Sequence, residues 1–353
     1  RANRETLVRR LYLDLTGLPP NLVQAESFIN DTSPNAYAKL VDGLLASPHY
    51  GERMVWDWLD ASRYADSNGY QGDNERTMWP WRDWVVNEFN QNLPFNEFTV
   101  WQLAGDLLPA PTHEQILATG FNRNHMINGE GGRIAEENRV DYVMDMSETM
   151  GSVWLGLTLN CCRCHDHKFD PLTQREYYQF TAFFNQTPVT GGGGNAQTPP
   201  VLDCPLPGQS GKIEKAEADW KRTLDLLRTK EGELFPRAAN KQLVESTATA
   251  ELSKPVRDAL SLVPASRKSE QWELLIKEFG GKQDEYGTLL KAASNAKKAL
   301  DEIRNAVPRV MVMKDEDKPR QTFLLNRGLY NQPGPEVQAA VPGVLPAMEV
   351  GDG

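Results

Sequence analysis

One short stretch of the chain, NCCRCHDHKFDP at residues 160–171, gathers most of its thiols and two of its five imidazoles. Within it, Cys161, Cys164 and His165 form C-x-x-C-H, the attachment signature of a c-type haem. Two thiols at this spacing can add to the two vinyl groups of one porphyrin, and the histidine that follows can direct a ring nitrogen at the iron. The motif therefore predicts covalent haem c, with His165 as the iron ligand.

The same side chains suit other chemistry. Together with His167, they could instead hold zinc or a non-haem iron ion in a mixed sulfur and nitrogen site. A redox-active C-x-x-C is a third interpretation, but no strand–helix–strand pattern surrounds the motif. A buried disulfide between Cys162 and Cys204 is compatible with each of these interpretations.

The sixth position of a haem iron matters because that ligand sets the reduction potential and separates electron transfer from substrate chemistry. His167 cannot easily reach the opposite face of a porphyrin held by His165, two residues away. The candidates therefore lie elsewhere in the chain, and an open sixth position would favour an enzyme. They are Met126 and His125 in NRNHMINGEGG, Met146, Met150 and His49.

A second unusual stretch, NGEGGRIAEENR at residues 128–139, surrounds Glu130 with glycines. A loop that needs backbone freedom and presents one carboxylate often faces a ligand or an ion. If the iron position is open, Glu130, His167 and Asp66 are the expected proton-handling, catalytic groups.

Helices are expected to position these loops, because apolar residues recur with a 3.6-residue period from residue 4 to about 190. The segment 134–155 reads as one long helix, and its acidic face is expected to be solvated. Thr173 and Glu176 form a capping box that begins the next helix, so the cysteine loop lies between two helices. Seven of the nine tryptophans precede residue 155, and this density predicts a packed aromatic core. The acidic face consists of Glu137, Asp141, Asp145 and Glu148.

The fold class expected is mainly α, in four parts. A helical haem-type domain at 1–190 is followed by a Gly/Pro-rich linker at 191–210. Heptad-spaced apolar residues then predict an antiparallel coiled-coil hairpin with a helical insert at 211–307. The last part, 308–353, is expected to hold a β-hairpin, made from RVMVM and QTFLLNRG joined by KDEDKP, and an extended tail that continues into a further domain.

Charge and hydropathy limit the kinds of partner that the protein is expected to bind. The 353 residues include 38 Lys and Arg against 48 Asp and Glu, a net charge of −10, which argues against nucleic acid and anionic membrane surfaces as partners. No apolar run is long enough for a transmembrane segment. The expected partner is a redox protein or a small-molecule or carbohydrate substrate, and nothing in the sequence indicates an oligomeric state. Because the chain opens without Met, a signal peptide or further N-terminal region is expected before it.

The order of the motifs resembles that of a known family, the large planctomycete-type cytochrome c-like proteins, which carry a cytochrome-c-like domain of unknown function. The resemblance covers nearly the whole chain, and two positions depart from the family pattern: Cys162 stands where Ala is usual, and Met146 where Arg is usual. The stretches that carry it are LVRRLYLDLTGLPP, LLASPHYGERMVWDWLDASRYADSNGY, FNRNHMINGEGG, VWLGLTLNCCRCHDHKFDPLTQREYYQFTAFF and TFLLNRGLYNQPG.

This resemblance implies an exported, periplasmic bacterial protein whose redox work is linked to polysaccharide breakdown. It also implies a small cytochrome domain before this chain and a second domain of unknown function after it. The motif positions that the resemblance covers are Cys161, Cys164, His165, His167, Asp170, Glu130, His49, Arg63, Tyr64 and Asp66.

The sequence leaves three functional hypotheses open: an exported c-type electron carrier, a haem- or metal-dependent oxidoreductase with an open coordination site, and a scaffold with a structural metal.

Overall fold

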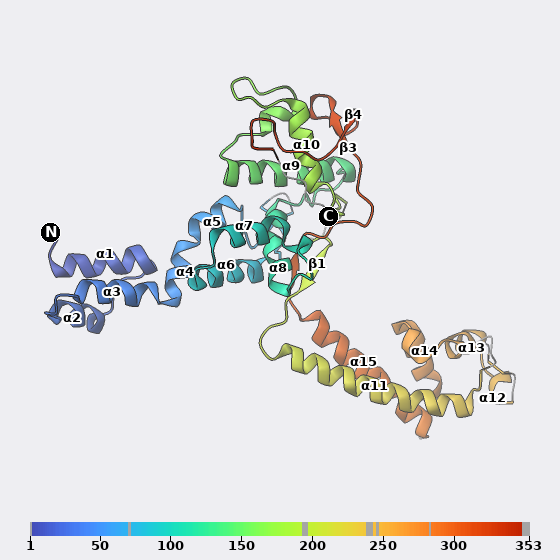
Figure 1. Cartoon of the computed structure of the whole chain (residues 1–353). Coiled ribbons are helices and arrows are strands. Elements are labelled where there is room, and N and C mark those ends of the chain that lie inside the picture. The colour runs from blue at the N-terminus through green and yellow to red at the C-terminus, as the bar shows by residue number, and fades with distance from the viewer. Residues whose placement is uncertain are drawn as a thin grey trace. The chain divides into compact units, whose positions relative to one another are not determined.

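The computed structural model describes residues 2–69, 72–192, 197–237, 243–244, 247–281 and 284–347. The chain divides into two compact units, unit 1 at Arg1–Asp203 with Arg309–Gly353 and unit 2 at Cys204–Pro308 (Figure 1). The described residues are mainly helical, with small antiparallel sheets, as the sequence predicts. Part of the predicted linker and the end of the predicted tail lie outside the described residues.

Unit 1 begins with short helices whose ends follow local sequence signals. Asn3 caps the first helix by accepting a hydrogen bond from the Thr6 amide, a contact that contributes about 1 kcal/mol. Gly17 ends it at φ 69°, a conformation that glycine adopts without strain. Val8, Phe28 and Ala36 form the small core between these helices. The helices are α1 (Arg4–Thr16), α2 (Leu22–Asn30), α3 (Ala36–Leu45), α4 (Pro48–Met54) and α5 (Trp56–Ala61).

An aromatic core follows, and it confirms the predicted packing for most of the early tryptophans, although Trp56 is 60% exposed. Phe121 and Trp154 meet edge to face with ring centroids 4.6 Å apart, and Trp84 stacks on Phe98 at 5.7 Å. Trp81 is fully buried. The elements around this core are α6 (Trp79–Gln91), α7 (Phe95–Ala104), α8 (His113–Ala118) and the 3₁₀ turns η1 (Gly105–Leu107) and η2 (Thr119–Asn124).

The helices that flank the cysteine loop are α9 (Ala135–Met150) and α10 (Gln174–Phe184). The expected single helix at 134–155 changes to a π-helical turn, η3, at Gly151–Leu155. A Cβ at Gly151 would lie 2.5 Å from Leu159 Cδ1, so a larger residue there would displace the Leu159 side chain. The capping box of Thr173 and Glu176 begins α10, as predicted.

The strands are present, but the predicted β-hairpin at 308–353 is wrong in its pairing. β2 (Arg309–Met311) pairs with β1 (Val201–Asp203), and β3 (Thr322–Leu325) pairs with β4 (Pro333–Val337), both antiparallel. The segment between β2 and β3 does not make a tight turn because it is held by other residues. Glu316 N donates to Gln186 O, and Lys314 N donates to Thr187 Oγ1.

Unit 2 is built around two long helices, α11 (Gln209–Leu234) and α15 (Glu285–Asn305). They lie antiparallel, because Arg304 pairs with Glu217 and Lys230 pairs with Glu285 at opposite ends. Between them the chain forms α12 (Thr247–Ala250), α13 (Lys254–Ser261), η5 (Pro264–Ser266) and α14 (Ser269–Phe279). The shared core includes Leu227, Leu260, Leu275, Tyr286 and Leu290.

A buried ionic network lies at the end of α11. The fully buried Glu231 carboxylate contacts Arg237 Nη2 at 2.6 Å and Arg267 Nη2 at 2.7 Å. Tyr286 donates its hydroxyl to the other oxygen at 2.8 Å. Both carboxylate oxygens are therefore satisfied, which is the condition for burying such a group.

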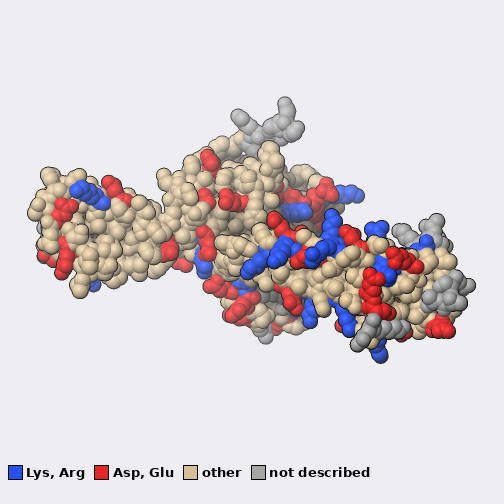
Figure 2. Space-filling model, turned by 90° about the horizontal axis from the view of Figure 1, so that it is seen from below, with Lys and Arg blue, Asp and Glu red and all other residues tan. Residues whose placement is uncertain are grey.

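Charges on the surface are mixed in sign. On the face shown in Figure 2, basic and acidic side chains are interspersed. Surface ion pairs such as Lys297–Asp301 and Arg222–Asp219 contribute little individually. Within the part of the chain that the structure describes, no helix has the length and hydropathy needed to cross a membrane.

Candidate functional site

The C-x-x-C-H motif lies on a 3₁₀ turn, η4 (Asn160–Arg163), and the residues directly after it. Cys161 and Cys164 are exposed, whereas Cys162 between them is fully buried with its sulfur 3.8 Å from Leu172 O. The two motif thiols are therefore exposed on this turn, whereas the thiol of Cys162 is buried. Cys162 is a free thiol, so the disulfide considered between Cys162 and Cys204 is not formed. The two thiols belong to different units.

His165 is exposed, and a hydrogen bond to a backbone carbonyl indicates which ring nitrogen carries the proton. Its Nδ1 lies 2.6 Å from Asp166 O, and since a carbonyl oxygen only accepts, Nδ1 carries the proton. Nε2 then holds a lone pair. This is the tautomer that metal-binding histidines use when Nδ1–H donates to a backbone carbonyl.

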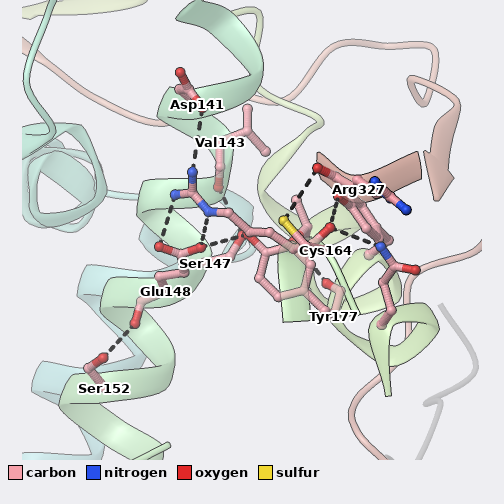
Figure 3. Close-up of polar contacts among 12 residues, drawn as sticks. Asp141, Val143, Ser147, Glu148, Ser152, Cys164, Tyr177 and Arg327 are labelled. Carbon is pink, nitrogen blue, oxygen red and sulfur yellow. Dashed lines mark hydrogen bonds and ion pairs between the residues drawn. The ribbon is translucent and has the colours of Figure 1, made fainter. Parts of the chain in front are cut away.

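Arg163, between the two motif cysteines, ties the loop to Glu148 and Asp141 of α9, which Figure 3 labels. Its guanidinium forms a two-point contact with Glu148, at 2.5 and 2.9 Å, and approaches Asp141 at 3.5 Å. Tyr177 from α10 donates its hydroxyl to the same Glu148 carboxylate at 2.8 Å. Burial, together with the charge of Glu148, raises the pKa of Tyr177 well above its ordinary value. Two-point charged contacts of this kind fix geometry as well as adding energy.

Backbone contacts hold the other side of the loop. Arg163 O accepts hydrogen bonds from Tyr178 Oη at 2.8 Å and from Gln174 Nε2 at 2.9 Å. Cys164 Sγ lies 3.3 Å from Arg327 O, on the turn that follows β3 (Figure 3). Gly328 in that turn has φ 74°, and a Cβ there would lie 3.5 Å from the same sulfur. The motif is thus held by α9, α10 and a turn about 160 residues further along the chain.

The His167 side chain forms its hydrogen bonds within the cysteine loop. Its Nδ1 accepts backbone hydrogen bonds from Phe169 at 3.3 Å and Asp170 at 2.8 Å. Asp170 Oδ2 lies 3.3 Å from the same nitrogen, but two amide donors already occupy its lone pair, so this contact is not a charged pair. Among the described residues, no group of three or more His, Cys, Asp or Glu side chains is arranged to hold a metal ion.

A cleft of about 300 Å³ lies beside the loop and is lined by residues of both unusual sequence stretches. Arg163 comes from the cysteine loop, and His125 and Met126 come from the segment that leads into the stretch at residues 128–139. The other lining residues are Asn128, Asn138, Asp141, Tyr142 and Asp145. The two predicted iron ligands His125 and Met126 therefore share one cleft with a motif residue.

His125 is almost completely buried and stacks on Tyr142 with ring centroids 4.6 Å apart. Its Nδ1 donates to Met126 O at 3.0 Å, so Nε2 is an unprotonated nitrogen. Burial, and then the charges of Arg123, Arg63 and Arg76, lower its pKa well below the ordinary value. His125 is therefore neutral.

Arg63 and Asp145 form a partly buried pair next to His125, with side chains 27% and 36% exposed. Arg63 Nη2 lies 2.9 Å from Asp145 Oδ2, but the contact is a charge pair rather than an aligned hydrogen bond. Burial lowers the pKa of Arg63, and burial raises the pKa of Asp145 despite the facing guanidinium. The expectation that the acidic face of α9 is solvated is therefore wrong for Asp145 and Glu148, which bind arginines.

The other predicted site residues are dispersed. Glu130 is exposed, and its amide donates to Asn128 Oδ1 at 2.8 Å. Asp66 is exposed and accepts the Tyr64 hydroxyl at 2.5 Å. His49 is exposed and contacts Glu52 in α4. Met126 is 55% exposed, and the remaining sulfur candidates, Met146 and Met150, lie in α9, where Met146 is fully buried.

Sequence reasoning missed Arg163, Glu148, Tyr177 and Gln174 as residues that position the motif. Arg163 was detectable as the one basic residue inside the C-x-x-C-H motif. Its partners were not, because nothing local shows that Glu148 faces the loop.

The fold is mainly helical, and it presents C-x-x-C-H on a loop that Arg163 anchors to α9. The chain belongs to the family described as "PSCyt2: Protein of unknown function (DUF1549)", whose model matches residues 1–189. No curated protein and no solved structure matches the chain.

Proposed function

We propose that unit 1 is a c-type haem domain that carries out electron transfer or redox chemistry. Cys161 and Cys164 would hold the porphyrin through thioether bonds, and His165 would bind the iron. When bound, the haem would supply a one-electron redox centre. The observation that carries this proposal is the state of the motif: two exposed free thiols beside an exposed histidine whose Nδ1–H is tied to Asp166 O.

The surrounding contacts support the same proposal. Arg163 and Gln174 fix the backbone of the motif, so the two thiols and the imidazole are presented from a rigid turn. His125 and Met126 remain the candidates for the sixth position, because they line the cleft that Arg163 also lines. We place this protein in the periplasm or elsewhere outside the cytoplasm of a bacterium, and we propose that its redox work serves polysaccharide breakdown.

We propose a separate role for unit 2. The antiparallel helices α11 and α15 would form a coiled-coil hairpin that acts as a spacer or docking arm. The buried side chains on their facing sides, among them Leu227, Leu290, Ala293 and Leu300, support this.

Covalent haem in matched cysteine variants tests the haem proposal. The chain is expressed together with a c-type haem attachment system, and haem that survives denaturing electrophoresis is stained. Cys161→Ser with Cys164→Ser is expected to abolish the stain. Cys162→Ala, which removes the buried thiol between them, is the control and should retain it. Staining that persists in the double variant, or that depends on Cys162, contradicts the assignment.

A further inference from the structure

A second cleft, of about 560 Å³, lies in unit 1 away from the cysteine motif. Its volume is within the range of small-molecule sites. It is bounded by the end of α7, by α10 and by the segments that follow β2 and β4, so the fold brings together four distant parts of the chain. Its walls are largely apolar, with side chains that include Leu103, Met150, Phe180, Phe184 and Met313.

Two carboxylate side chains line the cleft beside these apolar residues. Asp106 comes from η1, and Asp315 comes from the segment after β2. The fully buried Thr187 holds Asp315 in place by donating its hydroxyl to Oδ1 at 3.2 Å. Burial, and then the charge of Asp315, raises the pKa of Asp106 to about 6. Burial also raises the pKa of Asp315.

The charge of the cleft is negative. Glu316 and Glu336 also line it, and within the described part of the chain Arg320 is the one basic side chain that lines it. Arg320 Nη2 already lies 3.5 Å from Glu316. A bound cation would offset the cost of burying Asp106 and Asp315, and the phenylalanine rings can add cation–π attraction.

We propose that this cleft binds a small organic cation, with an ammonium group beside Asp106 and Asp315 and an apolar group against Phe180, Phe184 and Met313. A bare metal ion fits less well, because Ca²⁺ and Mg²⁺ require a shell of about six oxygen ligands and the walls are mostly carbon. The site does not depend on the haem proposal. Much of its lining lies after residue 189, beyond the part of the chain that the family model matches.

Calorimetry with a charged and an uncharged probe of the same shape tests this proposal. At pH 8, 2-phenylethylammonium is expected to bind at least about ten-fold more tightly than 2-phenylethanol, a difference that one favourable charge contact supplies. Equal affinities, or no binding of the ammonium probe, would overturn the proposal.

A variant and a pH series locate the binding. Asp106→Asn should reduce the preference for the ammonium probe several-fold, whereas Asp317→Asn, an exposed residue of the same 314–319 segment that does not line the cleft, should leave it unchanged. Equal effects of the two variants would place the binding elsewhere and refute the site.

If Asp106→Asn does not fold, a pH series on the unaltered protein tests whether the Asp106 carboxylate contributes to binding. Lowering the pH from 8 to 5 protonates Asp106, so the preference must fall around pH 6. The lining residues that carry charge near Asp106 are Asp315, Glu316, Arg320 and Glu336, and no histidine lines the cleft among the residues that the structure describes. A preference that is constant from pH 8 to pH 5 contradicts the proposal.

Discussion

The two units differ in how many of their buried polar and charged atoms have hydrogen-bond partners. In unit 2, Glu231 is fully buried, and both its oxygens receive charged or hydroxyl donors. Among the described residues of unit 2, Trp220 Nε1 and Arg267 Nη1 are the buried side-chain atoms without a hydrogen bond. Unit 1 has more of them, including His125 Nε2, both side-chain polar atoms of Asn124, and Asp145 Oδ2. Buried polar atoms are normally paired. The Glu231 network therefore stabilises the fold, whereas these atoms near the cleft can still take a hydrogen-bond partner.

The largest effect on stability is expected in unit 2. Glu231→Ala leaves Arg237, Arg267 and Tyr286 without their shared partner, and the loss of one member of a buried ion pair costs about 3–5 kcal/mol. Hydrogen exchange of the α13 and α14 amides should report the destabilisation. Glu217→Ala, which removes an exposed partner of Arg304, is the control and should cost under about 1 kcal/mol. Equal effects of the two variants would show that the network adds no more than a surface pair.

A smaller effect is expected at the cysteine loop. Arg163→Leu removes the two-point contact with Glu148, which is partly exposed, and should cost about 2 kcal/mol. It should also lower the yield of covalent haem, because the motif loses its tie to α9. Urea unfolding measures the first effect, and haem staining measures the second.

Arg222→Leu provides the comparison for this variant, since Arg222 forms an exposed surface pair with Asp219 on α11. It should change stability by no more than a few tenths of a kcal/mol and leave haem content unchanged. If Arg163→Leu behaves in the same way, Arg163 does not position the motif.

The smallest effect on the site is expected from removing unit 2 altogether. Asp203 and Arg309 are register partners at the end of the β1–β2 pair, so an Asn-Gly turn can join them in place of residues 204–308. The shortened chain should retain the circular dichroism and the haem content of unit 1. Loss of either would show that the two units do not fold independently.

The features predicted correctly from the sequence are those that depend on nearby residues. The capping box of Thr173 and Glu176 needs only four consecutive positions, and it begins α10 as expected. Helix α2 begins at the same kind of local signal, a capping box formed by Asn21 and Gln24.

Long-range partners were not predictable in the same way. The strands RVMVM and QTFLLNRG are close in sequence, yet each pairs with a strand on its other side, because Gln186 and Thr187 hold the segment between them. The partners of Asp145 and Glu148 come from residues 63 and 163, and no local pattern shows that they meet. The C-x-x-C-H motif was recognisable because its chemistry lies within five positions.

The central claim is that the exposed thiols of Cys161 and Cys164 carry haem. The most direct measurement is the pyridine haemochrome spectrum of the unaltered chain, purified after co-expression with a c-type attachment system and extracted with acidified acetone. We expect the protein to keep its haem through extraction, with the spectrum of a porphyrin bound by two thioethers and about one haem per chain. A colourless protein, or haem that the solvent removes, would contradict the account.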